Sequence, residues 1–284
     1  MTQALTTRRA FAVVAVLAAF AALLVVAGRT AGSTAGAASS ATTIKIGTEA
    51  YYPPFESFAK DNKTIVGLDP DMAAALGKVL GAKITFTHTA FDGLLPALDS
   101  GRFDVVMAAI TDTKERQAKF DFVDYFKSGQ GIIVKKGNPK GIHGLKDLCG
   151  KKVAVLKASV QQKLLDATNG KECSSNKISI IALPSDKDAL LQIRSGRADA
   201  SITQDAVARY NTSAGDAATQ YEVANAKPID PVPLGIVFKK GSPWRDKFKS
   251  ALQKIQADGS YDKVLKKYSL SSGAYRPVTV NAGK

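Results

Sequence analysis

The chain is poor in the residues and motifs on which most metal sites and hydrolytic sites depend. Its 284 residues include only two cysteines and two histidines. It has no zinc-binding signature, no nucleophile elbow and no glycine loop built to hold a phosphate. The two histidines stand apart, His88 within a predicted strand and His143 in a glycine-rich loop. We therefore expect no metal site and no cofactor.

Acidic residues are also outnumbered, with 25 Asp and Glu against 39 Lys and Arg, which gives a formal net charge of +14. A basic balance is typical of proteins that bind nucleic acid. Here the lysines are scattered over predicted helix faces, as in "KFKSALQKIQ", and no motif combines aromatic with basic residues. We expect a solvated, lysine-rich surface and no nucleic-acid partner.

Long apolar runs are absent after the first 41 residues, but one lies inside them. Arg8 and Arg9 precede an uncharged stretch over residues 11–27, and a small-residue tract with an A-x-A pattern follows at residues 35–37. This order is typical of an export signal. Cleavage near Ala37 or Ala41 would place the protein outside the cytoplasm, in a periplasm or secreted. The alternative is an uncleaved N-terminal membrane anchor, although the run is just short of the roughly 20 residues of a comfortable span.

The two cysteines, Cys149 and Cys173, both fall in the exported part of the chain. An oxidising compartment favours a disulfide between them. Two free, buried thiols are the alternative.

Short apolar strands alternate with amphipathic helices along the whole exported part, a pattern typical of parallel sheets covered by helices. The layout occurs twice, since "ALDSGRFDVVMA" and "QIRSGRADASIT" match in form and place Asp104 and Asp199 three residues after a glycine. The sequence therefore predicts two similar α/β lobes. The segments "GQGIIVKKG" and "PIDPVPLGIVFKKG" read as extended strands that cross between the lobes, on either side of a hinged cleft. The predicted limits are a signal peptide and small-residue tract over 1–41, the first part of lobe 1 over 42–129, lobe 2 over 130–229, and a return to lobe 1 with the C-terminal helices over 230–284.

One arginine has an unusual place beside a strand end. In "AAITDTKERQAKFDF", Asp112 is a predicted helix cap, Glu115 completes a capping box, and Arg116 falls in the first helical turn. The start of a helix already carries partial positive charge, so a cation there needs an anion. We expect a carboxylate of a bound ligand to supply it.

Other polar and aromatic residues also follow predicted strands, and ligands of such α/β proteins bind beyond the carboxyl ends of the strands. Thr111 would assist Arg116 on the carboxylate, Asp205 offers an acceptor for an ammonium group, and Glu49 adds a second acid. Ser159 opens a predicted helix with a capping box to Gln162 and leaves the amide of Val160 free for an anion. Tyr52 and Phe91 offer flat walls. A zwitterion with a polar or cationic side chain fits this set.

These residues lie in segments that resemble one known family. The segments are "IGTEAYYPPFE", "VGLDPDMAAALGKVLG", "FDGLLPALDSGRFDVVMAAITDTKERQAKFDFVDYF", "LCGKKVAV", "SGRADASITQDAV" and "DGSYDKVLKKY". Together they are similar to the solute-binding proteins of amino-acid ABC transporters, the bacterial extracellular family 3. The resemblance implies a two-lobed fold of the periplasmic-binding-protein type II class that closes on its ligand and presents it to a membrane permease.

The resemblance also implies a role for individual residues. Arg116 corresponds to the arginine that holds the α-carboxylate, helped by Thr111 and the backbone of Ala109. Asp205 corresponds to the acid that receives the α-ammonium, and Ser159 and Val160 correspond to the anion-binding turn of the second lobe. Tyr52 and Phe91 correspond to the aromatic walls. Glu49 stands where the family has an acid that faces the ligand side chain.

An acid at Glu49 repels a side-chain carboxylate, so we expect arginine, lysine, histidine or glutamine as the ligand. The expected partners are this free amino acid and an ABC permease, and the protein is expected to be a monomer. Two alternatives remain. One is an enzyme on the same scaffold, similar to arogenate or prephenate dehydratases, in which Glu49, Asp69 and Asp205 perform acid–base chemistry. The other is an amino-acid sensor that feeds no permease.

Overall fold

The computed structural model describes residues 42–213 and 215–284. The predicted signal peptide lies outside these residues. None of the helices in the described part of the chain is both long enough and apolar enough to span a bilayer.

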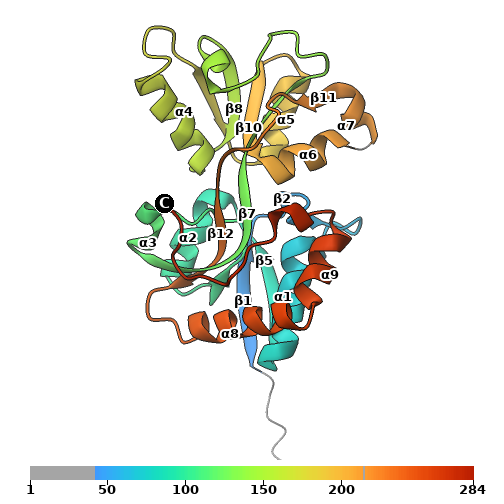
Figure 1. Cartoon of the computed structure of the whole chain (residues 1–284), viewed down its shortest axis with the longest axis vertical. Coiled ribbons are helices and arrows are strands. Elements are labelled where there is room, and N and C mark those ends of the chain that lie inside the picture. The colour runs from blue at the N-terminus through green and yellow to red at the C-terminus, as the bar shows by residue number, and fades with distance from the viewer. Residues whose placement is uncertain (1–41, 214) are drawn as a thin grey trace, which may run out of the picture. The chain divides into compact units, whose positions relative to one another are not determined.

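The first lobe, the lower one in Figure 1, is built on a short parallel sheet with β1 in the middle. Helices cover this sheet, and the apolar faces of α1 and β1 share one buried core. A small antiparallel sheet follows β1 directly and carries Tyr52. The elements are β1 (Thr43–Thr48), β2 (Tyr51–Tyr52), β3 (Glu56–Phe58), β4 (Ile65–Val66), α1 (Leu68–Leu80), β5 (Lys83–His88), α2 (Phe91–Asp99), β6 (Val105–Val106) and α3 (Lys114–Gln117).

The second lobe repeats this plan with β8 between the parallel strands β9 and β10. The repeat extends to detail: the Asp104 carboxylate accepts the Lys45 amide at 2.8 Å in lobe 1, and the Asp199 carboxylate accepts the Lys152 amide at 2.9 Å in lobe 2. The predicted likeness of the two halves is confirmed at this point. The elements are a 3-10 turn (Leu145–Leu148), β8 (Lys152–Leu156), α4 (Val160–Gly170), β9 (Ser179–Leu183), α5 (Asp186–Arg194), β10 (Ala200–Gln204), α6 (Asp205–Ser213), α7 (Gly215–Gln220) and β11 (Tyr221–Val223).

Two long strands join the lobes. β7 (Phe120–Lys135) pairs with β12 (Ile229–Lys239) in antiparallel fashion and continues into lobe 2, where it pairs with β10. The strand order β5-β1-β6-β12-β7-β10-β8-β9 is therefore symmetric about the β12–β7 pair. The two strands approach closely, since a Cβ atom at Gly129 would lie 2.6 Å from the Ile229 carbonyl oxygen. The predicted lobe limits at 129/130 and 229/230 fall in this pair and stay a prediction.

The last helices pack on α1 of the first lobe. In α8 (Trp244–Ala257) the predicted stripe is buried at Phe248, Leu252 and Ile255, and Trp244 packs at its edge. Each fully buried side chain of this size contributes about 1.5–3 kcal/mol. α9 (Ser260–Lys267) and a 3-10 turn (Ser271–Gly273) follow, and the final residues return along β7, where the Asp124 amide donates to the Thr279 carbonyl.

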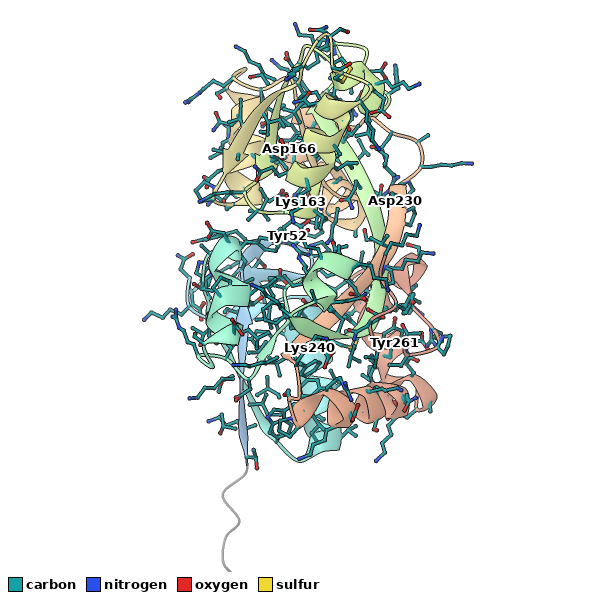
Figure 2. All side chains as sticks on the ribbon, turned by 90° about the vertical axis from the view of Figure 1, so that its left-hand side faces the viewer. Tyr52, Lys163, Asp166, Asp230, Lys240 and Tyr261 are labelled. Atoms are coloured by element: carbon teal, nitrogen blue, oxygen red, sulfur yellow. A yellow bond between two sulfur atoms is a disulfide. The ribbon has the colours of Figure 1, made fainter. Side chains whose placement is uncertain are left out.

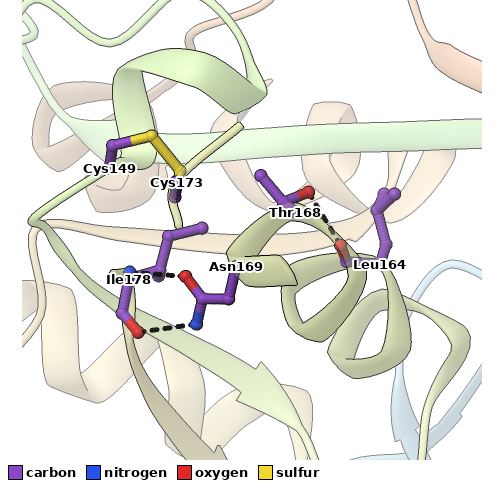
Figure 3. Close-up of a disulfide and its surroundings, with 6 residues drawn as sticks. All are labelled: Cys149, Leu164, Thr168, Asn169, Cys173 and Ile178. Atoms are coloured by element: carbon purple, nitrogen blue, oxygen red, sulfur yellow. Dashed lines mark hydrogen bonds between the residues drawn. A yellow bond between two sulfur atoms is a disulfide. The ribbon is translucent and has the colours of Figure 1, made fainter. Parts of the chain in front are cut away.

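The predicted disulfide between Cys149 and Cys173 is present in lobe 2 (Figure 3). Cys173 is buried in the same core as Leu148 and Leu165. Next to it, the Asn169 side chain bonds to both the amide and the carbonyl of Ile178, at 2.7 and 3.0 Å. The bridge thus ties the end of α4 to the 3-10 turn before β8.

Replacing both cysteines by alanine is expected to lower the free energy of unfolding by about 3.5 kcal/mol, the loop-entropy value for residues 24 apart in sequence. Urea unfolding monitored by circular dichroism measures the change. Wild-type protein unfolded with reductant present is the control and should match the variant. Equal midpoints for the oxidised wild type and the variant would contradict the prediction.

Candidate ligand-binding site

The carboxyl ends of the parallel strands of both lobes face each other, and a small cavity lies between them. Its volume is about 10 Å³, so it has room for little more than one water molecule. Every predicted ligand residue except Ser159 and Asp205 lines it. The lining residues are Glu49, Tyr52, Glu56, Phe91, Ala108, Ala109, Thr111, Arg116, Leu156, Val160, Gln161 and Gln204.

The helix that carries Arg116 begins one residue later than predicted. Its cap is Thr113, whose hydroxyl accepts the Arg116 amide at 3.3 Å, so the predicted cap at Asp112 is wrong. The Asp112 carboxylate is buried and already accepts the Gly283 amide at 2.7 Å and the Gln117 side-chain amide at 2.8 Å. These two donors, one distant in sequence and one in the same helix, take the oxygens that a cap would need.

The Arg116 guanidinium has no carboxylate partner within ion-pair distance among the described residues. Its Nη1 donates to the Thr111 carbonyl at 2.8 Å, and its Cζ lies 5.9 Å from the centre of the Phe91 ring. Burial lowers the pKa of Arg116 to about 10, so the side chain still carries its charge at neutral pH. The charged Arg116 guanidinium is therefore free to bind the anionic group of a ligand.

Glu49 and Tyr52 follow β1 and are both buried. Burial, with repulsion from Asp186 as the next cause, raises the pKa of Glu49 to about 8. The Tyr52 hydroxyl lies 3.0 Å from the Thr203 hydroxyl and accepts the Gln204 amide at 3.2 Å, so it joins the two lobes. Figure 2 shows Tyr52 at the face of the lower lobe, below Lys163 of the upper lobe.

In lobe 2, the predicted cap of α4 at Ser159 is confirmed, but the Gln162 side chain bonds one residue before the cap, so the reciprocal bond of a capping box is not formed. The Ser159 hydroxyl accepts the Gln162 amide at 3.1 Å, and the Gln162 side chain accepts the Ala158 amide at 2.8 Å. Val160 then lines the cavity with the first turn of the helix. Ala158 and Ala109, on opposite sides of the cavity, have positive φ angles of 60° and 47°. Such strained backbone is concentrated at ligand sites.

The structure does not bring Asp205 to the wall of this cavity. Asp205 begins α6, and its Oδ2 accepts from Arg209 Nε at 2.8 Å beside a different cavity of about 700 Å³. Its Oδ1 is buried and has no hydrogen-bond partner in the described part of the chain. The predicted role of Asp205 toward an ammonium group stays a prediction.

Three residues at the interlobe boundary were missed from the sequence. Gln204 precedes Asp205, and its side-chain amide donates to the Ala109 carbonyl at 2.7 Å across the lobes. Glu56 lines the cavity with both carboxylate oxygens buried. Asp186 begins α5 directly after β9. The rule that ligands bind beyond strand ends would have selected Asp186 and Gln204.

Two ion pairs also bridge the lobes at the rim of the cavity. Lys157 Nζ lies 3.0 Å from the Asp92 carboxylate, and Lys163 pairs with Glu115. Exposed pairs of this kind contribute at most about 1 kcal/mol each. They hold the lobes together only weakly, and a group larger than a water molecule fits the cavity only when the lobes separate.

The described residues contain no group of three or more His, Cys, Asp and Glu side chains placed to hold a metal ion.

Known proteins match most of the chain. Residues 44–271 match the bacterial extracellular solute-binding proteins, family 3. The arginine-binding extracellular protein ArtP of Bacillus subtilis is 34% identical over 245 residues, which are 83% of this chain and 89% of that protein.

Solved structures are similar as well. An ancestral arginine-binding protein bound to arginine is 36% identical with a TM-score of 0.74, and covers 80% of this chain and 97% of its own. An ancestral arginine-binding protein bound to glutamine is 37% identical with a TM-score of 0.72, and covers 80% of this chain and 98% of its own. An ancestral amino-acid-binding protein described as a precursor of cyclohexadienyl dehydratase is 35% identical with a TM-score of 0.70, and covers 80% of this chain and 95% of its own.

The raised pKa of Glu49 has a measurable effect on stability. Because the folded value is about 8 against an ordinary 4.5, the folded protein holds a proton that the unfolded chain loses. The stability from this proton is full below pH 4.5 and is lost as the pH rises through 8. Glu49→Gln has no such proton, so ligand-free variant protein should gain about 5 kcal/mol over the wild type between pH 4.5 and 8.5.

Urea unfolding at a series of pH values measures this gain. Glu172→Gln, at an exposed position, is the matched control and should follow the wild type. A constant difference between Glu49→Gln and the wild type at all pH values would contradict the burial of an acid at this site.

Proposed function

Because the chain belongs to the bacterial extracellular solute-binding proteins of family 3, we propose that it captures a free polar or basic amino acid between its lobes and delivers it to an ABC importer. The observation that carries this proposal is the uncompensated Arg116 guanidinium at the interlobe cavity. The predicted export signal agrees with work outside the cytoplasm.

The α-carboxylate of the ligand binds Arg116. A guanidinium presents paired N–H donors that fit a carboxylate with two parallel hydrogen bonds. The Thr111 hydroxyl lies on the same wall, and the first amides of α4 approach from the other lobe. A carboxylate held from both lobes favours the closed form, since a ligand shifts the open–closed balance only by its preference for one state.

The α-ammonium binds where the Gln204 amide now lies. The Ala109 carbonyl accepts that amide at 2.7 Å, and an ammonium group is a stronger donor for the same oxygen. The unpartnered Asp205 Oδ1 on the next residue supplies the negative charge. Tyr52 and Phe91 then enclose the aliphatic part of the ligand.

The side chain of the ligand faces Glu49, which supports a basic or polar amino acid: arginine, lysine, histidine or glutamine. The relatives named for arginine and the ancestral complexes with arginine and glutamine support the same group. A transport protein must release its ligand as well as capture it. A micromolar dissociation constant, which corresponds to a binding free energy of about 8 kcal/mol, allows both.

Catalysis on this scaffold is the second candidate, and the likeness to a precursor of cyclohexadienyl dehydratase favours it. Of the three acids considered for catalysis, Glu49, Asp69 and Asp205, one is already hydrogen-bonded within the protein. Asp69 accepts from the Tyr125 hydroxyl at 2.6 Å and from the Ala109 amide at 3.1 Å. The curated relative is named as a binding protein. We therefore propose binding without turnover, and an assay of the pure protein with prephenate and arogenate checks this.

Arg116→Ala should weaken amino-acid binding at least about 30-fold, the loss expected when one partner of a buried charged pair is removed. Isothermal titration calorimetry on protein stripped of ligand measures it, with the ligand chosen by a thermal-shift panel of the twenty amino acids. The fold should survive, because the half-buried side chain makes one hydrogen bond, to Thr111.

Arg102→Ala is the matched control, since Arg102 lies over Phe103 and outside the cavity lining. It should bind like the wild type. Affinity retained by Arg116→Ala would show that the carboxylate binds elsewhere.

A further inference from the structure

Two buried carboxylates at the interlobe boundary have oxygens with no hydrogen-bond partner among the described residues. Asp186 of lobe 2 is 2% exposed, and both of its oxygens are unpartnered. Glu49 of lobe 1 is also 2% exposed, and its Oε2 is unpartnered. Buried carboxylates are normally hydrogen-bonded or paired with a cation, so each points to a missing partner.

The two acids come from elements that pack against each other. The first turns of α5 contact β2, the strand that follows Glu49, and Lys187 Nζ lies 5.6 Å from the centre of the Tyr51 ring. Repulsion from Asp186 is one cause of the raised pKa of both Glu49 and Tyr52. Glu49 and Tyr52 line the cavity, whereas Asp186 is outside its lining and lies on the side where α5 packs against β2.

No charge within reach neutralises this pair. The neighbouring Lys187 ammonium is drawn to the Tyr51 ring, and the Asp188 carboxylate accepts the Ser185 hydroxyl at 2.8 Å. The Thr203 hydroxyl lies 3.0 Å from the Tyr52 hydroxyl, and it lowers the pKa of Asp186 but brings no charge. Burial raises the pKa of Asp186 to about 7, so both acids hold protons more readily than usual when no cation is present.

We propose that Glu49 and Asp186 form one subsite, with an acid from each lobe, that binds a guanidinium side chain and so makes the protein selective for arginine. This inference rests on the proposed capture of a free amino acid. A guanidinium is planar, always charged and carries five N–H donors, so it can bridge two carboxylates. An ammonium presents a single point charge, and a neutral amide can donate hydrogen bonds to a carboxylate but brings no positive charge.

The subsite also gives the ligand a second contact with both lobes. The carboxylate end is held by Arg116 and the start of α4, and the side-chain end by Glu49 and Asp186. Both ends of a bound arginine therefore stabilise the closed form. A neutral amino acid stabilises it only through its carboxylate end and leaves the two acids facing each other.

Citrulline separates charge from shape, because its ureido group replaces the guanidinium with almost no change in size. Calorimetry at pH 7.5 should find that the wild type binds arginine at least about 30-fold more tightly than citrulline, with lysine between them. Asp186→Asn should weaken arginine binding about tenfold or more and change citrulline binding less than about threefold. Retained binding of citrulline shows that the variant is folded.

Asp188→Asn is the matched control, with the same change of charge in the same helical turn but a carboxylate that already has a partner. It should lower arginine affinity less than about threefold. Equal wild-type affinities for arginine and citrulline, equal losses for both ligands in Asp186→Asn, or tighter binding of lysine than of arginine would each overturn the subsite.

Failure of the proposed function looks different from failure of the subsite. A wild type that binds none of the twenty amino acids overturns the proposed function and this inference with it. A wild type that binds glutamine through Arg116 but does not prefer arginine over citrulline overturns the subsite alone.

Discussion

The antiparallel pairing of β7 with β12 determines how the parallel sheets of the two lobes are placed. β12 leaves the lobe boundary toward lobe 1, and β7 leaves it toward lobe 2. β6 and β10 pair antiparallel to these strands, so both run back toward the boundary. The carboxyl ends of both parallel sheets therefore face one cavity, and loops far apart in sequence supply its walls.

The walls of this cavity carry ionisable groups that have no oppositely charged partner in the described part of the chain. The half-buried Arg116 and the buried Glu49 and Glu56 line the cavity, and Asp186 is buried near Glu49 but outside the lining. Isolated buried charges destabilise a fold, and removal of one partner leaves the other uncompensated. Such an arrangement is consistent with a closed form that a zwitterionic ligand completes.

Much of the fold and part of the site followed from the sequence, because the signals were local. Strand and helix periods placed most elements, and the strand-end rule selected Arg116, Thr111, Glu49, Tyr52 and Phe91. The errors and omissions have long-range causes. Asp112 was expected to cap a helix, but Gly283, far along the chain, donates to it.

Asp186 was overlooked for a different reason. An acid in the first turn of a helix is ordinarily explained by the helix dipole, and its burial against the other lobe cannot be read from one segment. The pairing of Asp205 with Arg209, in contrast, has helical i,i+4 spacing and was open to prediction.

The chain has one tryptophan, and its position decides which optical signal is informative. Trp244 packs against Phe248 on α8, with the Lys247 ammonium 4.7 Å from its ring centre, and it lies outside the cavity lining. Its emission therefore reports melting of the first lobe and is insensitive to the approach of the two lobes. Closure must instead be followed with a dye attached near the rim, for example at an introduced thiol.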